Sequence, residues 1–97
     1  MQVKVTKHAV DQYRRRMQRY SMLESEITGV LRAAAIRGSK IRRCPGNVWE
    51  VQFENFVIIA SYREDAATVI TCLGTNEYRN WSKRQEIYPR YQERRAV

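Results

Sequence analysis

The single histidine of the chain is followed by arginines at helical spacing. In a helix, Gln12 lies one turn after His8, and Arg15 and Arg16 lie about two turns after it, so one imidazole faces two guanidinium groups. Histidine is the residue type whose ordinary pKa lies near neutral, so it can take a proton from a ribose 2′-hydroxyl. Guanidinium groups beside it would then stabilise the charge that develops at phosphorus. This pattern favours RNA cleavage without a metal ion, but a lone histidine near a helix start also serves as a cap or a packing residue.

A second group of such residues lies near the C-terminal end, where aromatic side chains alternate with cations. Cations neutralise phosphates, and aromatic rings stack bases by about 1–3 kcal/mol per base. The mixture is typical of single-stranded nucleic-acid binding, although the same rings can pack on a sheet edge and leave the cations in solvent. The residues predicted here to bind nucleic acid are Tyr78, Arg79, Trp81, Lys83 and Arg84.

The charge of the chain is strongly positive, with 18 Lys and Arg against 10 Asp and Glu, a formal net charge of +8. The excess lies in residues 1–20, 37–43 and 79–97, and an acidic stretch separates the last two. Cationic segments that converge on one face focus a field on a polyanion, whereas the alternative is a solvated basic surface without a partner. The further cations predicted to contact RNA or another nucleic acid are Arg15, Arg19, Arg42 and Arg43.

The sequence offers few ligands for a metal ion. Besides His8 it has only two cysteines, Cys44 and Cys72, and a metal site of thiols and imidazoles needs more. Glycine-rich phosphate loops and nucleophile elbows are absent, so we expect no metal and no cofactor. No apolar run reaches about 18 residues, and the N-terminus has no apolar signal segment. We therefore expect a cytoplasmic protein with reduced thiols that does not bind membranes.

Helices that position these residues are expected in the first part of the chain. Residues 2–5 alternate as a short strand, and Thr6 can cap an amphipathic helix that buries apolar side chains at spacings of three and four. Ser21 and Glu24 form a capping box, which predicts the start of a second helix. Gly38 is placed to end that helix in a left-handed conformation.

After the second helix the hydrophobic period changes to two. Residues 39–43 are predicted as a strand or an edge segment, and residues 49–53, 56–62 and 68–73 as a β-meander joined by turns. The run at 56–62 is almost wholly apolar, so this strand should lie centrally with both faces covered. Polar meander residues on an exposed face would contribute hydrogen bonds to a substrate; they are Glu50, Gln52, Ser61, Tyr62, Thr71 and Thr75.

The predicted element order is β-α-α-β-β-β, which defines the α+β class. Two N-terminal helices would pack on one face of a small antiparallel β-meander sheet. The chain length fits a single domain, predicted to span residues 1–81. Residues 82–97 are polar and charged, so we expect a basic, weakly ordered C-terminal tail.

The segment Thr6-Lys7-His8-Ala9, followed by Arg14 and Arg16, resembles the N-terminal signature of BrnT-like proteins. That family is a branch of the RelE/ParE-like toxin superfamily. An apolar run similar to residues 69–73 is common in the last strand of its members, and the similarity covers residues 5–75. Gln12 stands where the family pattern has its first arginine. The segment after Trp81 has no counterpart in the pattern.

The resemblance implies a RelE/ParE-like fold, and relatives of this fold include mRNA endonucleases, gyrase inhibitors and catalytically silent binders. Our first hypothesis is a metal-independent endoribonuclease of the toxin type. His8 would act as general base or acid, and Arg14 and Arg16 would bind the scissile phosphate. Tyr62 or Tyr78 would assist. The resemblance also implies an antitoxin as a protein partner.

Two other functions compete with this hypothesis, because a fold alone does not choose among functions. One is a non-catalytic phage or mobile-element protein that grips nucleic acid, or an acidic host protein, through the same cations. The other is a DNA-binding regulator, which ranks lower because no helix-turn-helix pair is apparent and the second helix is too apolar for a recognition helix. The sequence leaves the oligomeric state open.

Overall fold

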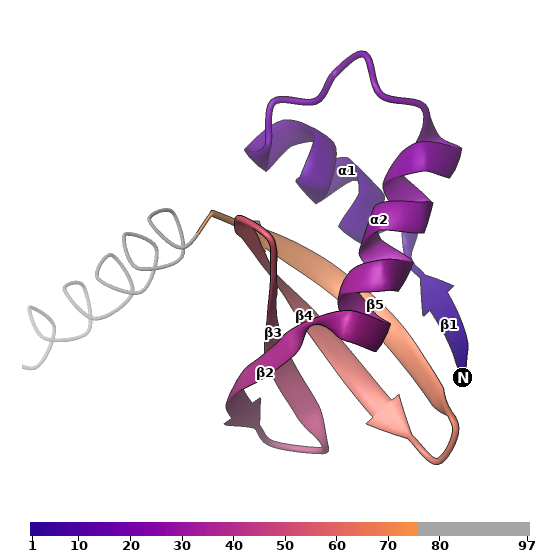
Figure 1. The fold of residues 1–97 in the computed structure, drawn as a ribbon, viewed down its shortest axis with the longest axis vertical. Coiled ribbons are helices and arrows are strands. Elements are labelled where there is room, and N and C mark those ends of the chain that lie inside the picture. The colour runs from indigo at the N-terminus through magenta and orange to yellow at the C-terminus, as the bar shows by residue number, and fades with distance from the viewer. Residues whose placement is uncertain (76–97) are drawn as a thin grey trace, which may run out of the picture.

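The computed structural model describes residues 1–75 and has an α+β architecture (Figure 1). Two helices pack against a five-stranded sheet, which agrees with the predicted class. The helices are α1 (Lys7–Arg16) and α2 (Glu24–Arg37). The strands are β1 (Gln2–Val5), β2 (Ser39–Cys44), β3 (Val48–Phe53), β4 (Phe56–Arg63) and β5 (Ala66–Gly74).

The sheet has the strand order β1-β5-β4-β3-β2. Strands β2 to β5 form the antiparallel meander, and the segment predicted as a strand or an edge is the edge strand β2. Strand β1 pairs with β5 in parallel, with Val5 opposite Val69. The sheet is therefore mixed, which corrects the prediction of a wholly antiparallel one. The element order is β-α-α-β-β-β-β, with one strand more than the predicted order, because residues 39–44 form a full strand. The helices carry the chain from the β1 edge across one face to the β2 edge.

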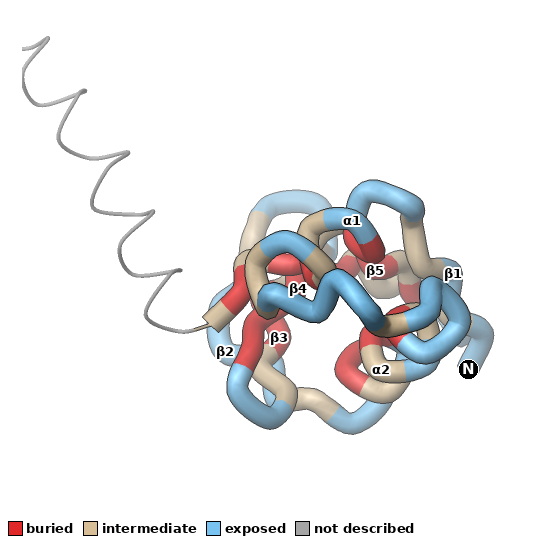
Figure 2. Tube along the Cα trace, turned by 90° about the horizontal axis from the view of Figure 1, so that it is seen from above, coloured by how far each residue is buried: buried red, intermediate tan, exposed pale blue. Residues whose placement is uncertain are grey.

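The hydrophobic core lies between the helices and the face of the sheet that they cover (Figure 2). Helix α1 buries Ala9, Val10 and Tyr13, as its amphipathic pattern predicts, and the Tyr13 ring meets Phe56 edge-on with centroids 5.2 Å apart. Val3 of β1 packs against the same cluster. The strand residues of the core alternate along their strands; they are Val51, Phe56, Ile58, Ala60, Ala67, Val69 and Cys72.

Both ends of α1 have well-defined caps. The Thr6 hydroxyl accepts a hydrogen bond from the Ala9 amide at 3.1 Å, which confirms the predicted cap, and it lies 3.0 Å from the Val69 carbonyl oxygen. At the other end, Gln18 has a φ of 54° and the Arg19 amide donates to the Arg14 carbonyl at 2.9 Å. This is a Schellman motif, in which a left-handed residue satisfies the last carbonyls of the helix.

Helix α2 begins later than predicted. Its N-cap is Leu23, whose amide donates to the Glu26 carboxylate at 3.2 Å, so the Ser21–Glu24 capping box is wrong by two residues. Glu24 and Glu26 both suit the first turn of a helix. The sequence pattern selected Glu24 because a serine, Ser21, lies three residues before it.

Gly38 ends α2 for a different reason than the one predicted. Its φ of −70° and ψ of 164° are extended rather than left-handed. A Cβ atom at this position would lie 2.5 Å from both the Ala34 carbonyl oxygen and Val51 Cγ1. Glycine is needed here because the end of the helix comes so close to β3.

Candidate nucleic-acid interface

The sheet has one face covered by α1 and α2 and a second face that neither helix covers (Figure 1), which we call the open face. Side chains alternate along a strand, so the neighbours of the core residues point to the open face. Polar and charged side chains share this face with apolar ones, Val48, Val57 and Ile59 among them, and Val57 is fully buried. Its polar residues include Lys4, Arg42, Glu50, Gln52, Ser61, Arg63, Thr68 and Thr71.

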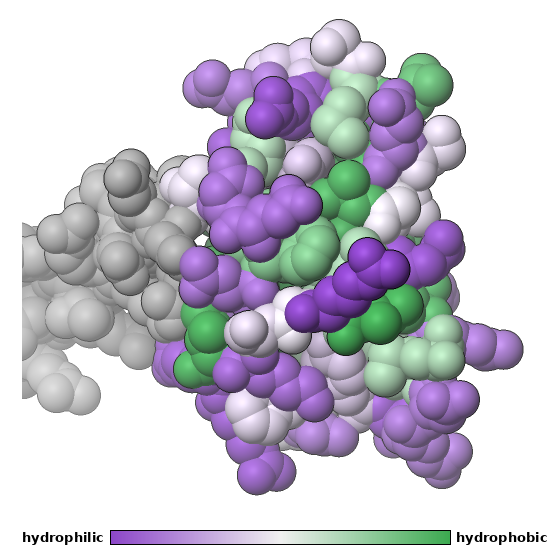
Figure 3. All heavy atoms as spheres, viewed as in Figure 1, coloured by the Kyte–Doolittle hydropathy of each residue, from purple (hydrophilic) through white to green (hydrophobic). Residues whose placement is uncertain are grey.

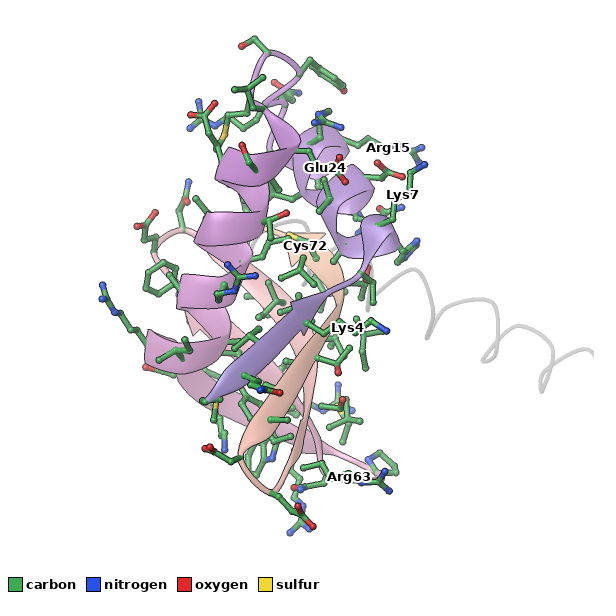
Figure 4. The ribbon with its side chains drawn as sticks, turned by 90° about the vertical axis from the view of Figure 1, so that its right-hand side faces the viewer. Lys4, Lys7, Arg15, Glu24, Arg63 and Cys72 are labelled. Carbon is green, nitrogen blue, oxygen red and sulfur yellow. The ribbon has the colours of Figure 1, made fainter. Side chains whose placement is uncertain are left out.

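Cations from separate parts of the chain share one side of the molecule. Figure 4 shows the side chains of Lys4, Lys7, Arg15 and Arg63 pointing to the same side, away from α2. All four residues are exposed. The parallel pairing of β1 with β5 brings Lys4 beside Thr68, near the last turn of the meander. Lys7 and Arg15 lie at the α1 end of this side and Lys4 and Arg63 at the other, so the positive charge extends along it, although Asp11 lies one helical turn from both Lys7 and Arg15. An extended polyanion suits such a surface.

The helix side has a different surface (Figure 3). Hydrophobic side chains appear there as separate patches among hydrophilic ones. Exposed large hydrophobic side chains occur in the loop between the helices, at the end of α2 and in β2; they are Tyr20, Leu23, Ile36 and Ile41. Scattered residues of this kind are normal on protein surfaces and need no partner.

His8 is exposed on the first turn of α1 and lies on one flank of the helix with Gln12 and Arg16. The Arg16 Nε donates to Gln12 Oε1 at 2.8 Å, and its Nη1 donates to the Leu73 carbonyl at 3.4 Å. Arg16 is therefore held between α1 and the end of β5, two turns from the imidazole. Gln12 thus orients this arginine.

Arg14 lies on the other flank of α1, although it was predicted to act beside Arg16. Two residues apart in a helix means about 200° apart around its axis. Arg14 Nη2 donates to the Met22 carbonyl at 3.2 Å, and Nη1 lies 4.0 Å from Asp11. Arg14 thus braces the loop between the helices, and the structure does not bring it to the phosphate side of His8.

Tyr62 also lies away from the predicted catalytic group. It continues the alternation of Ile58 and Ala60, so its ring points to the helix-covered face. Its hydroxyl donates to the Ala35 carbonyl at 2.7 Å, and Lys40 Nζ lies 4.2 Å from the ring centroid. Burial raises the pKa of the Tyr62 phenol. These contacts bind Tyr62 to α2 and β2, which corrects its predicted place beside His8.

The cations of β2 divide between the two faces. Arg42 lies opposite Glu50 on the open face, and its Nη1 is 3.5 Å from the Glu50 carboxylate. Arg43 pairs with Trp49, whose ring packs against the core, so it points to the other face. Lys40 also belongs to the helix-covered side. Of the two arginines predicted in this segment, only Arg42 joins the open face.

Glu50 is a feature that the sequence pattern undervalued. It is 2% exposed and is the only charged residue buried among residues 1–75. A glutamate that alternates with apolar residues in a strand is expected to face solvent. Its pairing with Arg42 becomes visible only when β2 and β3 are set in register. The pair holds the Arg42 guanidinium, whose side chain is 58% exposed, at the open face.

The remaining predicted residues fall into two groups. Arg15 and Arg19 are exposed at the end of α1 and just after it. The predicted contacts at Tyr78, Arg79, Trp81, Lys83 and Arg84, the domain end at residue 81 and the tail of residues 82–97 lie outside the described residues.

Comparison with family models, curated proteins and solved structures finds no match to this chain. Among residues 1–75, neither helix has the length and apolarity to cross a membrane. In the same range, no three His, Cys, Asp or Glu side chains gather as a metal site would require. The described residues form an α+β domain whose sheet has one face packed against two helices and a second face that carries cationic and hydroxyl side chains beside apolar ones.

Proposed function

We propose that this chain is a toxin-like RNA-binding protein, and that RNA lies along the open face and the His8 flank of α1. The proposal rests on the observation that four cationic side chains from three elements point to the same side of the molecule (Figure 4). They are Lys4, Lys7, Arg15 and Arg63. Cations in a row neutralise successive phosphates, and this term supplies most of the affinity for nucleic acid.

The polar side chains of the open face favour RNA over a featureless polyanion. Ser61, Thr68 and Thr71 offer hydroxyls that donate and accept, which suits phosphate oxygens and ribose 2′-hydroxyls. The described aromatic residues of the strands, Trp49 and Tyr62 among them, point to the helix-covered face. Contacts on the open face are therefore made to the RNA backbone rather than by base stacking, and they carry little sequence information.

Cleavage, in this proposal, depends on His8 and Arg16. His8 takes the proton of a ribose 2′-hydroxyl, and that oxygen attacks the adjacent phosphorus. The bond from phosphorus to the 5′ oxygen breaks, leaving a 2′,3′-cyclic phosphate, and the imidazolium returns its proton to the leaving oxygen. Arg16, fixed by Gln12 and the Leu73 carbonyl, stabilises the charge on the phosphorane. None of these steps needs a metal ion or a cofactor.

The same cations suit an acidic protein partner. An antitoxin or a host protein with an acidic surface would cover the open face and compete with RNA. Such a partner would act in the cytoplasm, where toxin and RNA meet.

Expression in bacteria, with growth and RNA ends as the readouts, tests the proposal. The wild type is expected to slow growth and to produce RNA fragments with 2′,3′-cyclic phosphate ends, and His8→Ala to do neither. Arg32→Gln, an exposed cation of α2, serves as the control and should behave as the wild type. If wild type and His8→Ala are equally harmless and no RNA is cut, cleavage is excluded.

A second candidate is a binding protein without chemistry. The observation that favours it is that Arg14 and Tyr62 are engaged with Met22 and Ala35 rather than with the His8 flank. RNA binding that survives His8→Ala and weakens steeply with salt, without cleavage by the wild type, would support this candidate.

A further inference from the structure

We propose that the open face carries a phosphate-binding pocket at the end of the sheet opposite α1. Ser61 and Thr68 form its floor, and Arg63 and Lys4 supply its positive charge. The expected ligand is a phosphate group of the RNA strand. The identity of that strand rests on the proposed function, whereas the binding of a phosphate anion does not.

The pocket is a hollow of about 740 Å³ between the β2–β3 turn and the β4–β5 turn. Ser61 and Thr68 are cross-strand partners on its floor, and Lys4 is the partner of Thr68 on β1. A single row across three strands thus contains two hydroxyl residues and one lysine, and the lysine lies next to the lining residue Thr68. The residues that line the hollow are Gly46, Asn47, Ser61, Tyr62, Arg63, Glu64, Ala66 and Thr68.

The walls of the pocket are held by hydrogen bonds. Asn47 Nδ2 donates to the Tyr62 carbonyl at 2.6 Å, and the Tyr62 amide donates to the Asn47 carbonyl at 3.1 Å. Gly46 and Asn47 have φ values of 77° and 61°, which turn the chain sharply at the rim. A rim fixed in advance loses little freedom when a ligand binds.

The charge at the pocket favours an anion. Arg63 is exposed and two residues after Ser61, on the same face, and Figure 4 shows it on the same side as Lys4. Glu64 opposes these cations from the turn. The other acid of that turn, Asp65, has its carboxylate 3.9 Å from the N-terminal ammonium group. Hydroxyl and guanidinium groups are donors of the kind that bind phosphate oxygens, and both line the hollow.

Other ligand classes fit the lining less well. An apolar molecule would leave the hydroxyls of Ser61 and Thr68 without hydrogen bonds. A divalent cation would find Glu64 as the single carboxylate of the lining, with the Arg63 guanidinium in the same lining.

The direct test is titration of the whole chain with inorganic pyrophosphate, followed by amide chemical shifts. Saturable shifts are expected at Ser61, Arg63 and Thr68, with amides of α2 unmoved. Arg63→Gln and Lys4→Gln should each weaken binding about tenfold. Arg32→Gln, which removes a cation from α2, should leave it unchanged. Shifts that are absent, or spread evenly over all the basic surfaces, would overturn the pocket.

Two further variants distinguish a specific phosphate site from non-specific attraction to a positively charged surface. Glu64→Gln removes the opposing carboxylate and is expected to tighten pyrophosphate binding several-fold. Replacement of the floor hydroxyls by Ser61→Ala with Thr68→Val should weaken it without any change in net charge. If the hydroxyl variant binds as the wild type does, the floor has no role and the proposal is wrong.

Titration with single-stranded RNA then places the pocket within the proposed function. Pyrophosphate binding together with RNA shifts at the same three amides supports both proposals. Pyrophosphate binding without RNA binding upholds the pocket and contradicts the proposed function. If RNA binds but the shifts of these three amides do not change, the proposed function is supported and the pocket is not part of the RNA-binding surface.

Discussion

The two faces of the sheet are built from the same strands but differ in chemistry, most clearly around Ser61 and Thr68. On the helix-covered face, Val51, Ile58 and Val69 are completely buried. On the open face, Ser61 and Thr68 are partly exposed and flanked by cations. Residues adjacent in sequence, such as Thr68 and Val69, therefore have different roles: Val69 packs in the core, and Thr68 lies on the open face. Stability and binding should respond to different substitutions, even where the substituted residues are adjacent.

The largest expected effect is on the covered face, where α2 ends against β3. Gly38→Ala places a methyl group within 2.5 Å of the Ala34 carbonyl and Val51 Cγ1, so it should lower the free energy of unfolding by about 3 kcal/mol. The midpoint of urea unfolding measures this loss.

Gly29→Ala is the matched control within the same helix. Nothing lies within 4 Å of a Cβ atom at Gly29, so the added methyl group should raise the free energy of unfolding by about 0.5–1 kcal/mol. Equal effects of the two substitutions would show that close packing at Gly38 is not what requires glycine there.

Alkaline pH should weaken the covered face through Cys72. Burial raises the pKa of this thiol from 9.0 to about 11, so the folded state keeps the proton while the unfolded chain loses it. The stability from this group is full below pH 9 and is lost as the pH rises toward 11, by about 2–3 kcal/mol. Burial of Tyr13 and Tyr62 raises their pKa values too and acts in the same direction at higher pH.

Unfolding measured from pH 8 to 11, with Cys72→Ala as the comparison, checks this expectation. The variant starts less stable because it leaves a small cavity, but its stability should fall less steeply with pH. A parallel loss in both proteins would mean that Cys72 is not the group responsible. A thiol reagent should also label the partly exposed Cys44 well before Cys72.

Reciprocal substitutions at two adjacent residues, Val to Thr on one face and Thr to Val on the other, compare the two faces directly. Val69→Thr puts a hydroxyl into the core and should cost about 2 kcal/mol. Thr68→Val removes a hydroxyl from the open face and should change stability by less than about 0.5 kcal/mol. Thermal unfolding of the two variants gives both values. If Thr68→Val costs as much as Val69→Thr, the open face is part of the core and its role in binding is undermined.

The smallest expected effect lies outside both faces. Gln18 has a φ of 54° after α1, so Gln18→Gly should raise the free energy of unfolding by about 0.5–1 kcal/mol. Gln18→Ala, which keeps a Cβ atom, should show no such gain. RNA binding should be the same in both variants, and a change would indicate that the loop between the helices belongs to the interface.

Much of the fold followed from local pattern. The cap at Thr6, the amphipathic α1 and the alternation in β3 are short-range features, and the structure confirms them. The direction of β1 and the reason for Gly38 depend on where the chain meets itself. A four-residue strand shows which side chains share a face but not which way its partner runs. A helix-end glycine looks the same whether it needs a left-handed φ or close contact.

The candidate site divides in the same way. Helical spacing puts Gln12 and Arg16 one turn apart, and their side chains are hydrogen-bonded. The catalytic pairing of His8 with Arg16 stays a prediction. Tyr62 was assigned to them from residue type alone, and its position in the alternation of β4 sends it to the other face. The Arg42–Glu50 pair was missed because two strands must first be set in register.

RNA affinity as a function of salt, in two double variants of equal charge, tests the central claim most directly. Lys4→Gln with Arg63→Gln removes two cations from the open face. Arg32→Gln with Arg37→Gln removes two exposed cations from α2. The claim predicts that the open-face variant binds single-stranded RNA at least tenfold more weakly and has a salt slope smaller by about 1–2, while the α2 variant binds as the wild type does. Equal losses in both variants, or a larger loss in the α2 variant, would contradict it.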